Sequence, residues 1–487
     1  MSEENVLLIF PPSSWGSIDA FAQPLGILGL ATILKQEGID VSVIDLAALG
    51  WYPDKLVDFI KKGSFTHVGI TVLTRLREIC YQILHMVKKI NPDITILVGG
   101  PHVTHVKEDI FSECPLIDIA VGGEADLEIV EIIRNPTKKF YDLGYVKDIR
   151  SLPIPDRTLI RHINYDRLQS IWIGDSASMK WDRGCPWRQC RFCSRPALNM
   201  AYRRRDPDEI IKEIAIIQND LKYKNLIIMD DDLHLKSKFT KKILRLKIKE
   251  SLDIPFWILT RAEHVDEEGV RLMRQANGTG FIIGLESIVP RVIDMYKKAS
   301  GNPHKWRETL DHVFDLANKY NLITIASFII GAPSETAEEI QATIDYCRTA
   351  AVDIVTVNPF RFAYKSDFWK EAIQKGQLSS DQFDVLNDKC FGTTQYTKQE
   401  LFKRAIETQH LISSPLLNPK RYYRIGQKLI KQRNPLLRRN IMRLPLLVKN
   451  LNDLGYRKLR KKGTLQNFYE HPYKTPQASD TQLVKKN

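Results

Sequence analysis

Short apolar runs alternate with amphipathic helical patterns along most of the chain, and this alternation restricts the fold more than any other feature. In the first third, the apolar runs are 6–10, 41–44, 67–72, 94–98 and 117–121, and helical spacing occupies 25–36, 55–62 and 76–90. Strands separated by helices predict a doubly wound parallel sheet. Ligands of such sheets bind at the carboxyl ends of the strands.

A second series of the same kind follows a stretch broken by Pro136, Pro153 and Pro155. Its predicted strands are 177–183, 225–230, 255–261, 279–286, 323–331 and 353–359, with helices at 207–221, 236–250, 266–276, 304–320 and 335–350. A length of 487 residues also suggests two or three domains. We therefore divide the chain into an α/β domain at 1–134, a linker at 135–176, a second α/β domain at 177–370 and a mainly helical extension at 371–487.

Three of the seven cysteines, Cys185, Cys190 and Cys193, lie within nine residues in a loop that also contains Gly184 and Pro186. In an intracellular chain, such a group is more typical of metal binding than of disulfides. Structural zinc needs a fourth ligand, and the nearest histidines are His162 and His234. Three thiolates on a [4Fe-4S] cluster would leave one iron open to another ligand. A cluster, zinc and three unrelated thiols remain the alternatives at this point.

The positive charge of the chain is concentrated in its last third. Residues 401–470 hold 17 Lys and Arg against Glu407, Asp453 and Glu470, whereas the net charge of the whole chain is +13. Short leucine-containing segments with a basic face could cap the barrel, meet a phosphorylated substrate, or lie on an anionic membrane surface. Nucleic acid is an unlikely partner, since no RNA-binding module is recognisable.

No apolar run approaches the roughly 20 residues needed to span a bilayer. The acidic start Met-Ser-Glu-Glu lacks the basic region of a signal peptide. We expect a cytoplasmic protein, with peripheral membrane association through 401–470 as an option.

The cysteine spacing Cys-x4-Cys-x2-Cys resembles the cluster loop of radical S-adenosylmethionine (SAM) enzymes, with Gln189 as an extra residue compared with the usual Cys-x3-Cys-x2-Cys. The resemblance implies that Cys185, Cys190 and Cys193 hold a [4Fe-4S] cluster whose open iron is chelated by SAM. It also places Phe192 beside the adenine. The second domain is then expected to be the partial (β/α)6 TIM barrel of this family.

The same resemblance assigns SAM-binding residues to the carboxyl ends of the later strands. An acidic group at 230–232 would meet the SAM ammonium, and Glu286 within Gly284-Leu285-Glu286-Ser287 would face the ribose hydroxyls. In the turn at 331–336 we expect Ser334 to cap the following helix. The predicted SAM contacts are Phe192, Asp230, Asp231, Arg261, Glu286, Ser287, Gly331 and Pro333.

The first domain resembles the cobalamin-binding domain that precedes many radical SAM domains, in the segments 23–26, 99–102 and 123–124. The implied cobalamin contacts are Pro12, Ser13, Thr71, Thr74, Gly99, Gly100, His102, Gly123 and Glu124. The family's Asp-x-His-x-x-Gly motif is absent, because the chain reads Asp45-Leu46-Ala47-Ala48-Leu49-Gly50. Cobalamin is therefore expected base-off without a histidine from this loop, unless the domain has lost its cofactor.

Taken together, the resemblance implies a cobalamin-dependent radical SAM enzyme with a [4Fe-4S] cluster, SAM and cobalamin as cofactors. The preferred activity is methylation of an unactivated carbon of a small-molecule or lipid-like intermediate, through a 5'-deoxyadenosyl radical and methylcobalamin. A flavodoxin- or ferredoxin-type protein would supply electrons. The alternatives are a cyclase or rearrangement enzyme with the same cofactors and, more remotely, a zinc-stabilised binding protein.

Overall fold

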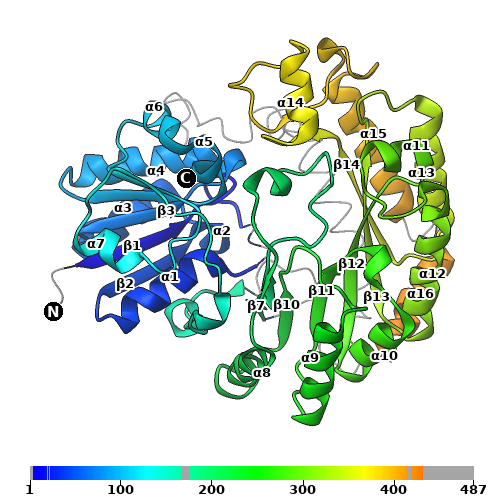
Figure 1. Cartoon of the computed structure of the whole chain (residues 1–487), viewed down its shortest axis with the longest axis horizontal. Coiled ribbons are helices and arrows are strands. Elements are labelled where there is room, and N and C mark those ends of the chain that lie inside the picture. Colours follow the sequence, from blue (N-terminus) through cyan, green and yellow to red (C-terminus); the bar gives the residue numbers. More distant parts are fainter. Residues whose placement is uncertain (1–3, 19, 21, 166–174, 414–417, 432–487) are drawn as a thin grey trace, which may run out of the picture.

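The chain folds around two six-stranded parallel sheets, one in each half (Figure 1). The structure is a computed structural model, and it describes residues 4–431 apart from 19, 21, 166–174 and 414–417. The sheets lie side by side, each accompanied by its own helices. This arrangement confirms the predicted α/β fold with two strand-helix domains.

The first sheet has the strand order β2-β1-β3-β4-β5-β6. Its strands are β1 (Asn5–Phe10), β2 (Asp40–Asp45), β3 (His67–Thr71), β4 (Thr95–Gly99), β5 (Ile119–Gly122) and β6 (Phe140–Asp142). Its helices are α1 (Leu25–Gln36), α2 (Leu46–Leu49), α3 (Pro53–Gly63), α4 (Arg77–Ile90), α5 (Pro101–Val106), α6 (Ile110–Glu113) and α7 (Ile129–Arg134). One face packs against α1 and α7, and the other against α3 and α4, so the sheet is doubly wound.

Two features of this sheet differ from the sequence prediction. β6 pairs with β5 and lies in the stretch 135–176, which we had assigned to a linker. Its three residues are too few to produce a recognisable alternation, so the strand depends on pairing with β5 and cannot be predicted from local sequence. α5 starts directly after Gly100, in a segment where the sequence pattern predicted no helix.

The second sheet has the order β14-β13-β12-β11-β10-β7 and forms an open, barrel-like arc. Its strands are β7 (Ser176–Met179), β10 (Asn225–Ile228), β11 (Phe256–Thr260), β12 (Gly278–Glu286), β13 (Ile323–Ile330) and β14 (Ile354–Pro359). The helices of this half are α8 (Pro207–Ala215), α9 (Lys238–Lys249), α10 (Glu267–Gln275), α11 (Pro290–Met295), α12 (Trp306–Lys319) and α13 (Ala337–Thr349). All six predicted strands are present.

The first of these strands is shorter than predicted. The segment 177–183 divides into β7 and a separate β8 (Asp182–Arg183), which pairs antiparallel with β9 (Arg203–Arg204). The small β8-β9 sheet brackets the cysteine loop. It fixes both ends of that loop at the carboxyl edge of the barrel.

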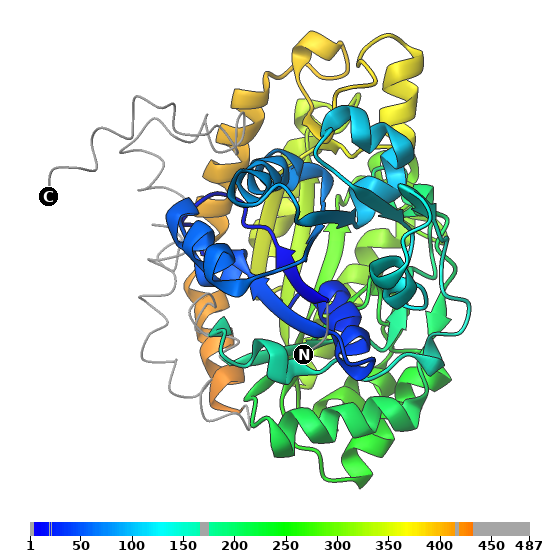
Figure 2. The same ribbon diagram turned by 90° about the vertical axis from the view of Figure 1, so that its left-hand side faces the viewer.

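After β14 the chain forms a two-stranded sheet of β15 (Arg361–Phe362) and β16 (Val385–Leu386). Between these strands lies α14 (Asp367–Gln374), which crosses the predicted start of the extension at residue 371. The extension continues with α15 (Lys398–Ser413) and α16 (Pro419–Ile430). α15 runs along the β14 edge, where the Gln409 side chain bonds both Val355 O and Val357 N (Figure 2). α16 packs against the inner side of the barrel floor through Ile425 and Leu429.

Several cations of the basic segment serve this cap. Asp353 is buried and accepts from Lys428 Nζ at 2.5 Å and from Arg424 Nε at 3.0 Å, while Arg421 donates to Cys347 O at 2.6 Å. Breaking such a buried ion pair costs several kcal/mol, so these charges are structural. The part of the segment beyond residue 431 lies outside the described residues, and with it most of the proposed membrane surface.

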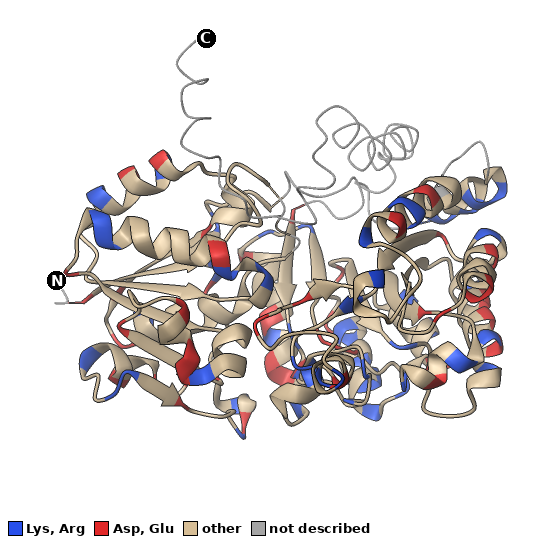
Figure 3. Ribbon diagram, turned by 90° about the horizontal axis from the view of Figure 1, so that it is seen from above, with Lys and Arg blue, Asp and Glu red and all other residues tan. Residues whose placement is uncertain are grey.

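Charges of both signs alternate on the helices of both halves (Figure 3). Among the described residues, no helix is both long enough and apolar enough to cross a membrane.

A buried network joins the two halves. Arg157 is 1% exposed and donates to Ser178 O at 2.6 Å and to Glu213 Oε1 at 2.5 Å, and Gln23 Oε1 accepts from the Ser178 backbone N–H at 3.1 Å. Gln23, which belongs to one of the cobalamin-like segments, therefore holds the two domains together. This network fixes the position of the first sheet against β7.

Candidate functional site

The cysteine loop is shaped by two residues with positive φ. Gly184 (φ 92°) lies so close to Ala201 O that an added Cβ would approach it to 2.7 Å. Arg188 (φ 49°) forms a turn just before Gln189, the extra residue of the Cys-x4-Cys spacing. Its guanidinium donates to Met200 O at 3.1 Å. The loop is further held by Arg191 N, which donates to Tyr296 O at 3.0 Å. The extra residue is thus accommodated in a defined turn.

All three loop cysteines are free and partly exposed. Burial raises the pKa of the Cys185 thiol, and it raises that of Cys193 to about 11. Backbone hydrogen bonds offset part of this increase. Arg195 N donates to Cys193 Sγ at 3.4 Å, and backbone N–H groups of Trp187 and Arg188 lower the pKa of Cys185. Hydrogen bonds of this kind favour the thiolates that bind metal.

Arg261, at the end of β11, lies against the loop. Its Nη1 is 3.7 Å from Cys190 Sγ, its guanidinium stacks 4.6 Å from the Trp187 ring, and Nη2 donates to Glu263 at 2.9 Å. Nη2 also donates to Lys298 O. Arg261 is 5% exposed, so a positive charge is held beside a cysteine sulfur with little solvent screening.

A group of carboxylates lies on the other side of the loop. Asp230 Oδ1 accepts from Trp181 N at 2.8 Å, and Arg195 forms an ion pair with Asp231 at 2.9 Å. In the described part of the chain, Asp182 Oδ1, Asp230 Oδ2 and Asp231 Oδ2 are buried without a hydrogen-bond partner. Burial raises the pKa of Asp230 to about 7 and that of Asp182 to about 9. A bound cation would satisfy these oxygens and restore their ionised form.

Three further predicted SAM residues have different surroundings in the structure. Glu286 (φ 67°) pairs with Lys298 at 2.9 Å above Gly284, at the carboxyl end of β12. Phe192 packs edge-on against Tyr296 at 5.0 Å. Ser287 is fully buried and its hydroxyl lies 3.1 Å from Thr343 Oγ1, so it faces α13 and is not available to a ligand in this structure.

The turn after β13 is held from within and by the C-terminal extension. Gly331 N donates to Glu335 at 2.7 Å, and an added Cβ on Gly331 would come within 2.4 Å of Leu401. Pro333 is partly exposed in the same turn. The prediction that Ser334 caps α13 was wrong, because Thr336 caps it in a reciprocal capping box with Glu339.

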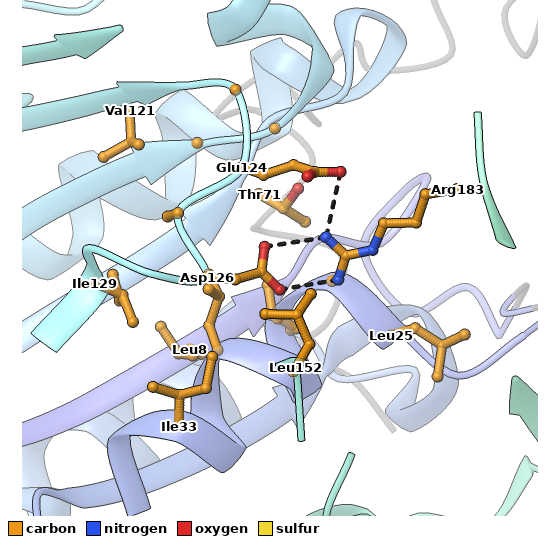
Figure 4. Close-up of a pocket in the computed structure, with 18 of the residues that line it drawn as sticks. Leu8, Leu25, Ile33, Thr71, Val121, Glu124, Asp126, Ile129, Leu152 and Arg183 are labelled. Carbon is orange, nitrogen blue, oxygen red and sulfur yellow. Dashed lines mark hydrogen bonds and ion pairs between the residues drawn. The ribbon is translucent and has the colours of Figure 1, made fainter. Parts of the chain in front are cut away.

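A cavity of about 380 Å³ runs along the α1/α7 face of the first sheet and reaches the barrel. Leu8, Ile33, Ile129 and Leu152 give it apolar walls (Figure 4). Its barrel end is lined by four residues that flank the cysteines on either side, namely Arg183, Arg195, Leu198 and Met200. The cysteine loop therefore lies at the mouth of this cavity.

Five of the nine predicted cobalamin residues line the cavity: Thr71, Gly99, Gly100, Gly123 and Glu124. Glu124 also accepts from Arg203 at 2.7 Å and pairs with Arg183 at 3.2 Å, which ties the cavity rim to β8 and β9. Arg183 pairs in addition with Asp126 at 2.8 Å, as Figure 4 shows.

Pro12, Ser13, Thr74 and His102 do not line it. His102 is fully buried, and its ring nitrogens lie 3.3 Å from Thr74 Oγ1 and 3.1 Å from Glu113 Oε2. Both nitrogens are thus engaged within the first domain. A loop histidine and a buried helical histidine look alike in sequence, and only the position of Glu113 distinguishes them.

Sequence reasoning missed Lys180, Asp182, Arg183 and Arg195. The sequence pattern did indicate Lys180 and Asp182. Ala177, Met179 and Trp181 are buried in the core between the sheet and its helices, so the residues that alternate with them point to the other side of the strand. That alternation places Ser178, Lys180 and Asp182 on the face toward the cavity and the barrel interior.

Two family models match the chain. The radical SAM superfamily model matches residues 180–347, and the B12-binding domain model matches residues 16–133. The chain belongs to the radical SAM superfamily and carries a B12-binding domain. It is therefore an enzyme whose family implies a [4Fe-4S] cluster, SAM and cobalamin.

Similar proteins agree with this assignment. The radical SAM chain is 29% identical, over 72% of its length and 80% of the relative, to the uncharacterised methyltransferase PH0819 of Pyrococcus horikoshii. It is 26% identical, over 71% of its length and 65% of the relative, to the anaerobic magnesium-protoporphyrin IX monomethyl ester cyclase of Rubrivivax gelatinosus. Among solved structures, the methyltransferase TsrM of Kitasatospora setae with tryptophan and a SAM analogue has a TM-score of 0.63 at 17% identity, covering 85% of this chain and 90% of TsrM. The similarity to this solved structure supports the fold.

The residues present fit the three cofactors. Gly26 and Gly29 of α1 line the cavity, and a Cβ on either would meet no atom within 4 Å, so the space is kept free for a large ligand. Unpartnered carboxylate oxygens suit the SAM ammonium. In the described part of the chain, no three Cys, His, Asp or Glu side chains converge on one ion position. A cubane instead takes each thiolate on a different iron.

Proposed function

We propose that this protein is a cobalamin-dependent methyltransferase that methylates an unactivated carbon of a small-molecule or lipid-like substrate. One observation carries the proposal: the cavity of the B12-binding domain ends at Arg183 and Arg195, which flank the cysteine loop on both sides. The two proposed cofactor sites are therefore adjacent. A substrate carbon placed between them could reach both.

When bound, the cluster with SAM supplies a hydrogen-abstracting radical and cobalamin supplies the methyl group. The chain positions these groups. Cys185, Cys190 and Cys193 hold the cluster, Arg261 places positive charge at Cys190, and Asp230 and Asp231 accept the SAM ammonium. The apolar walls of the cavity exclude water, which protects reactive species from side reactions.

The second candidate is a ring-closing or rearrangement enzyme with the same cofactors. It is favoured by the similarity to the cyclase of Rubrivivax gelatinosus. Methyl transfer ranks first because the uncharacterised methyltransferase PH0819 of Pyrococcus horikoshii is similar at higher identity and over a larger share of its own length than the cyclase. For both candidates we propose a flavodoxin- or ferredoxin-type electron donor.

The test starts with anaerobic protein reconstituted with iron, sulfide and hydroxocobalamin. We expect about four iron per chain, as a cubane requires, together with one cobalt and formation of 5'-deoxyadenosine on reduction with SAM. The protein is then incubated with a small-molecule extract of the organism that encodes it and with SAM carrying a deuterated methyl group. A product that gains the labelled methyl group supports methyl transfer. A changed product without label would favour the second candidate, and absence of cobalt would remove both.

A further inference from the structure

The cavity of the B12-binding domain is mostly apolar, yet four basic side chains line it: Lys180, Arg183, Arg195 and Arg205. Three of these have acidic partners. Arg183 pairs with Asp126 at 2.8 Å, Arg195 pairs with Asp231 at 2.9 Å, and Arg205 pairs with Glu213. For the Lys180 ammonium, the described part of the chain offers no hydrogen bond or ion pair. Lys180 is thus a cation without a fixed partner in the wall of a ligand cavity.

The backbone of Lys180 is well fixed. It directly follows β7, and its carbonyl oxygen accepts from Arg205 Nη1 at 3.0 Å. Arg205 is in turn held by Glu213, which also binds the buried Arg157. The lysine therefore projects from the barrel into a cavity whose other walls, such as Leu8 and Gly29, belong to the first sheet and its helix α1.

Of the two carboxyl groups that interact with this lysine, Asp182 is held mainly in the neutral form, and Asp230, with a pKa of about 7, is held there only in part. Lys180 lowers the pKa of both Asp182 and Asp230, but burial is the larger effect and leaves Asp182 with a pKa of about 9. Asp182 is therefore mostly protonated near neutral pH. A partly buried ammonium without a fixed counter-ion favours an anionic ligand, because charge interactions are stronger away from bulk water.

We propose that Lys180 binds the phosphodiester of a cobalamin whose nucleotide tail occupies this cavity. The proposal rests on the proposed function, in which this domain binds cobalamin. The phosphodiester is the one anionic group on the periphery of cobalamin, and its other side chains are neutral amides. Lysine binds phosphate as a point charge, which suits a single group held near the cavity wall. The contact would join the barrel to the B12-binding domain through the cofactor.

The test compares two corrinoids by equilibrium dialysis against the full-length protein. Hydroxocobalamin carries the nucleotide tail, whereas cobinamide has the same corrin ring without the phosphodiester, ribose and base. We expect Lys180→Met to raise the Kd for hydroxocobalamin about tenfold, as for loss of one charged contact, and to leave the Kd for cobinamide unchanged. Lys180→Arg should retain most of the affinity for hydroxocobalamin.

Lys297→Met is the matched control, because Lys297 is an exposed lysine next to the cysteine loop that does not line the cavity. It should change neither Kd. Equal weakening of both corrinoids by Lys180→Met, or no weakening of either, would overturn the assignment while wild-type binding still supported the proposed function. Wild-type protein that binds neither corrinoid would overturn both proposals.

Discussion

The cavity of the first sheet and the mouth of the barrel differ in the features that suit them to bind ligands. The cavity of the first sheet is defined by shape: apolar walls, and α1 glycines whose missing side chains leave room. The mouth of the barrel is defined by charge: buried carboxylate oxygens without partners, and a buried arginine against a cysteine. A shape-based site should be sensitive to added volume, and a charge-based site to lost or altered polar groups.

The largest expected effect comes from removing a cysteine on the charge-based side. Cys190→Ala should lose nearly all of the about four iron atoms per chain that a cubane holds, and with them all SAM cleavage. Hydroxocobalamin binding should remain within about twofold, a change well below the usual energy of one hydrogen bond. Iron, sulfide and corrinoid analysis of the same sample measures both.

Cys347→Ala provides the control for this variant, since Cys347 is 1% exposed in α13 and outside the loop. It should keep full iron content. Normal cluster content in Cys190→Ala would contradict the assignment of the three cysteines.

How much of this site is visible in the sequence differs between the two halves. The strands could be predicted because their apolar runs are buried, and β10 to β14 all lie where the pattern placed them. The cysteine loop could be identified because its three ligands are close in sequence. The direction of a side chain such as Ser287 could not, because its partner Thr343 lies in a helix 56 residues away.

For the cavity, too, only some of the lining residues could be predicted from the sequence. Gly99 and Gly123 could be proposed as ligand residues because they end strands of a parallel sheet. Gly29 could not, since a glycine in a helical pattern usually only weakens the helix. Its role depends on α1 facing the cavity, which is a tertiary property.

A bulky side chain on α1 should break the shape-based half alone. Gly29→Leu is expected to weaken hydroxocobalamin binding at least about 100-fold, or about 2.7 kcal/mol, since the new side chain would occupy the ligand's space. The apoprotein should be stabilised by up to about 1 kcal/mol, because leucine favours a helix over glycine. Equilibrium dialysis and urea unfolding measure the two quantities, and iron content should stay normal.

Gly426→Leu is matched to this change. Gly426 also lies within a helix, and an added Cβ would meet no atom within 4 Å, but Gly426 does not line the cavity. Cobalamin binding should not change. Similar losses in the two variants would mean that any leucine at an open helix position disturbs binding, and the cavity would lose its special role.

Arg261→Met should affect the cluster without removing it. The variant loses a positive charge 3.7 Å from Cys190 Sγ. Such a charge would stabilise the reduced form of the cluster, which is the more negative one. We expect the equilibrium constant for one-electron reduction to fall about tenfold, which lowers the potential by about 59 mV. A reductive titration followed by electron paramagnetic resonance measures it.

Arg245→Met removes a half-exposed arginine from α9, whose partner is Glu268, and should leave the potential unchanged. An unchanged potential in Arg261→Met would mean that this arginine serves the packing of Trp187 and Lys298 and has no electrostatic effect on the cluster.

The smallest expected effect concerns the stability of the apoprotein as a function of pH. Burial raises the pKa of Asp230 to about 7, so between its ordinary pKa and pH 7 the folded state binds more protons than the unfolded state. The free energy of unfolding should therefore fall as pH rises through this window, by roughly 1 kcal/mol between pH 6 and pH 7 for one such group.

Asp230→Asn keeps the oxygen that accepts from Trp181 N but cannot ionise, so the free energy of unfolding of this variant should depend less on pH. Part of the slope should remain, because the pKa of Asp182 is raised as well. Urea unfolding of both proteins at several pH values measures the difference, and adding SAM should reduce the slope of the wild type if its ammonium pairs with these carboxylates. Parallel slopes in the two proteins would show that the barrel mouth does not hold its carboxyl groups in the neutral form, and the contrast with the shape-based cavity would then rest on the cysteines and Arg261.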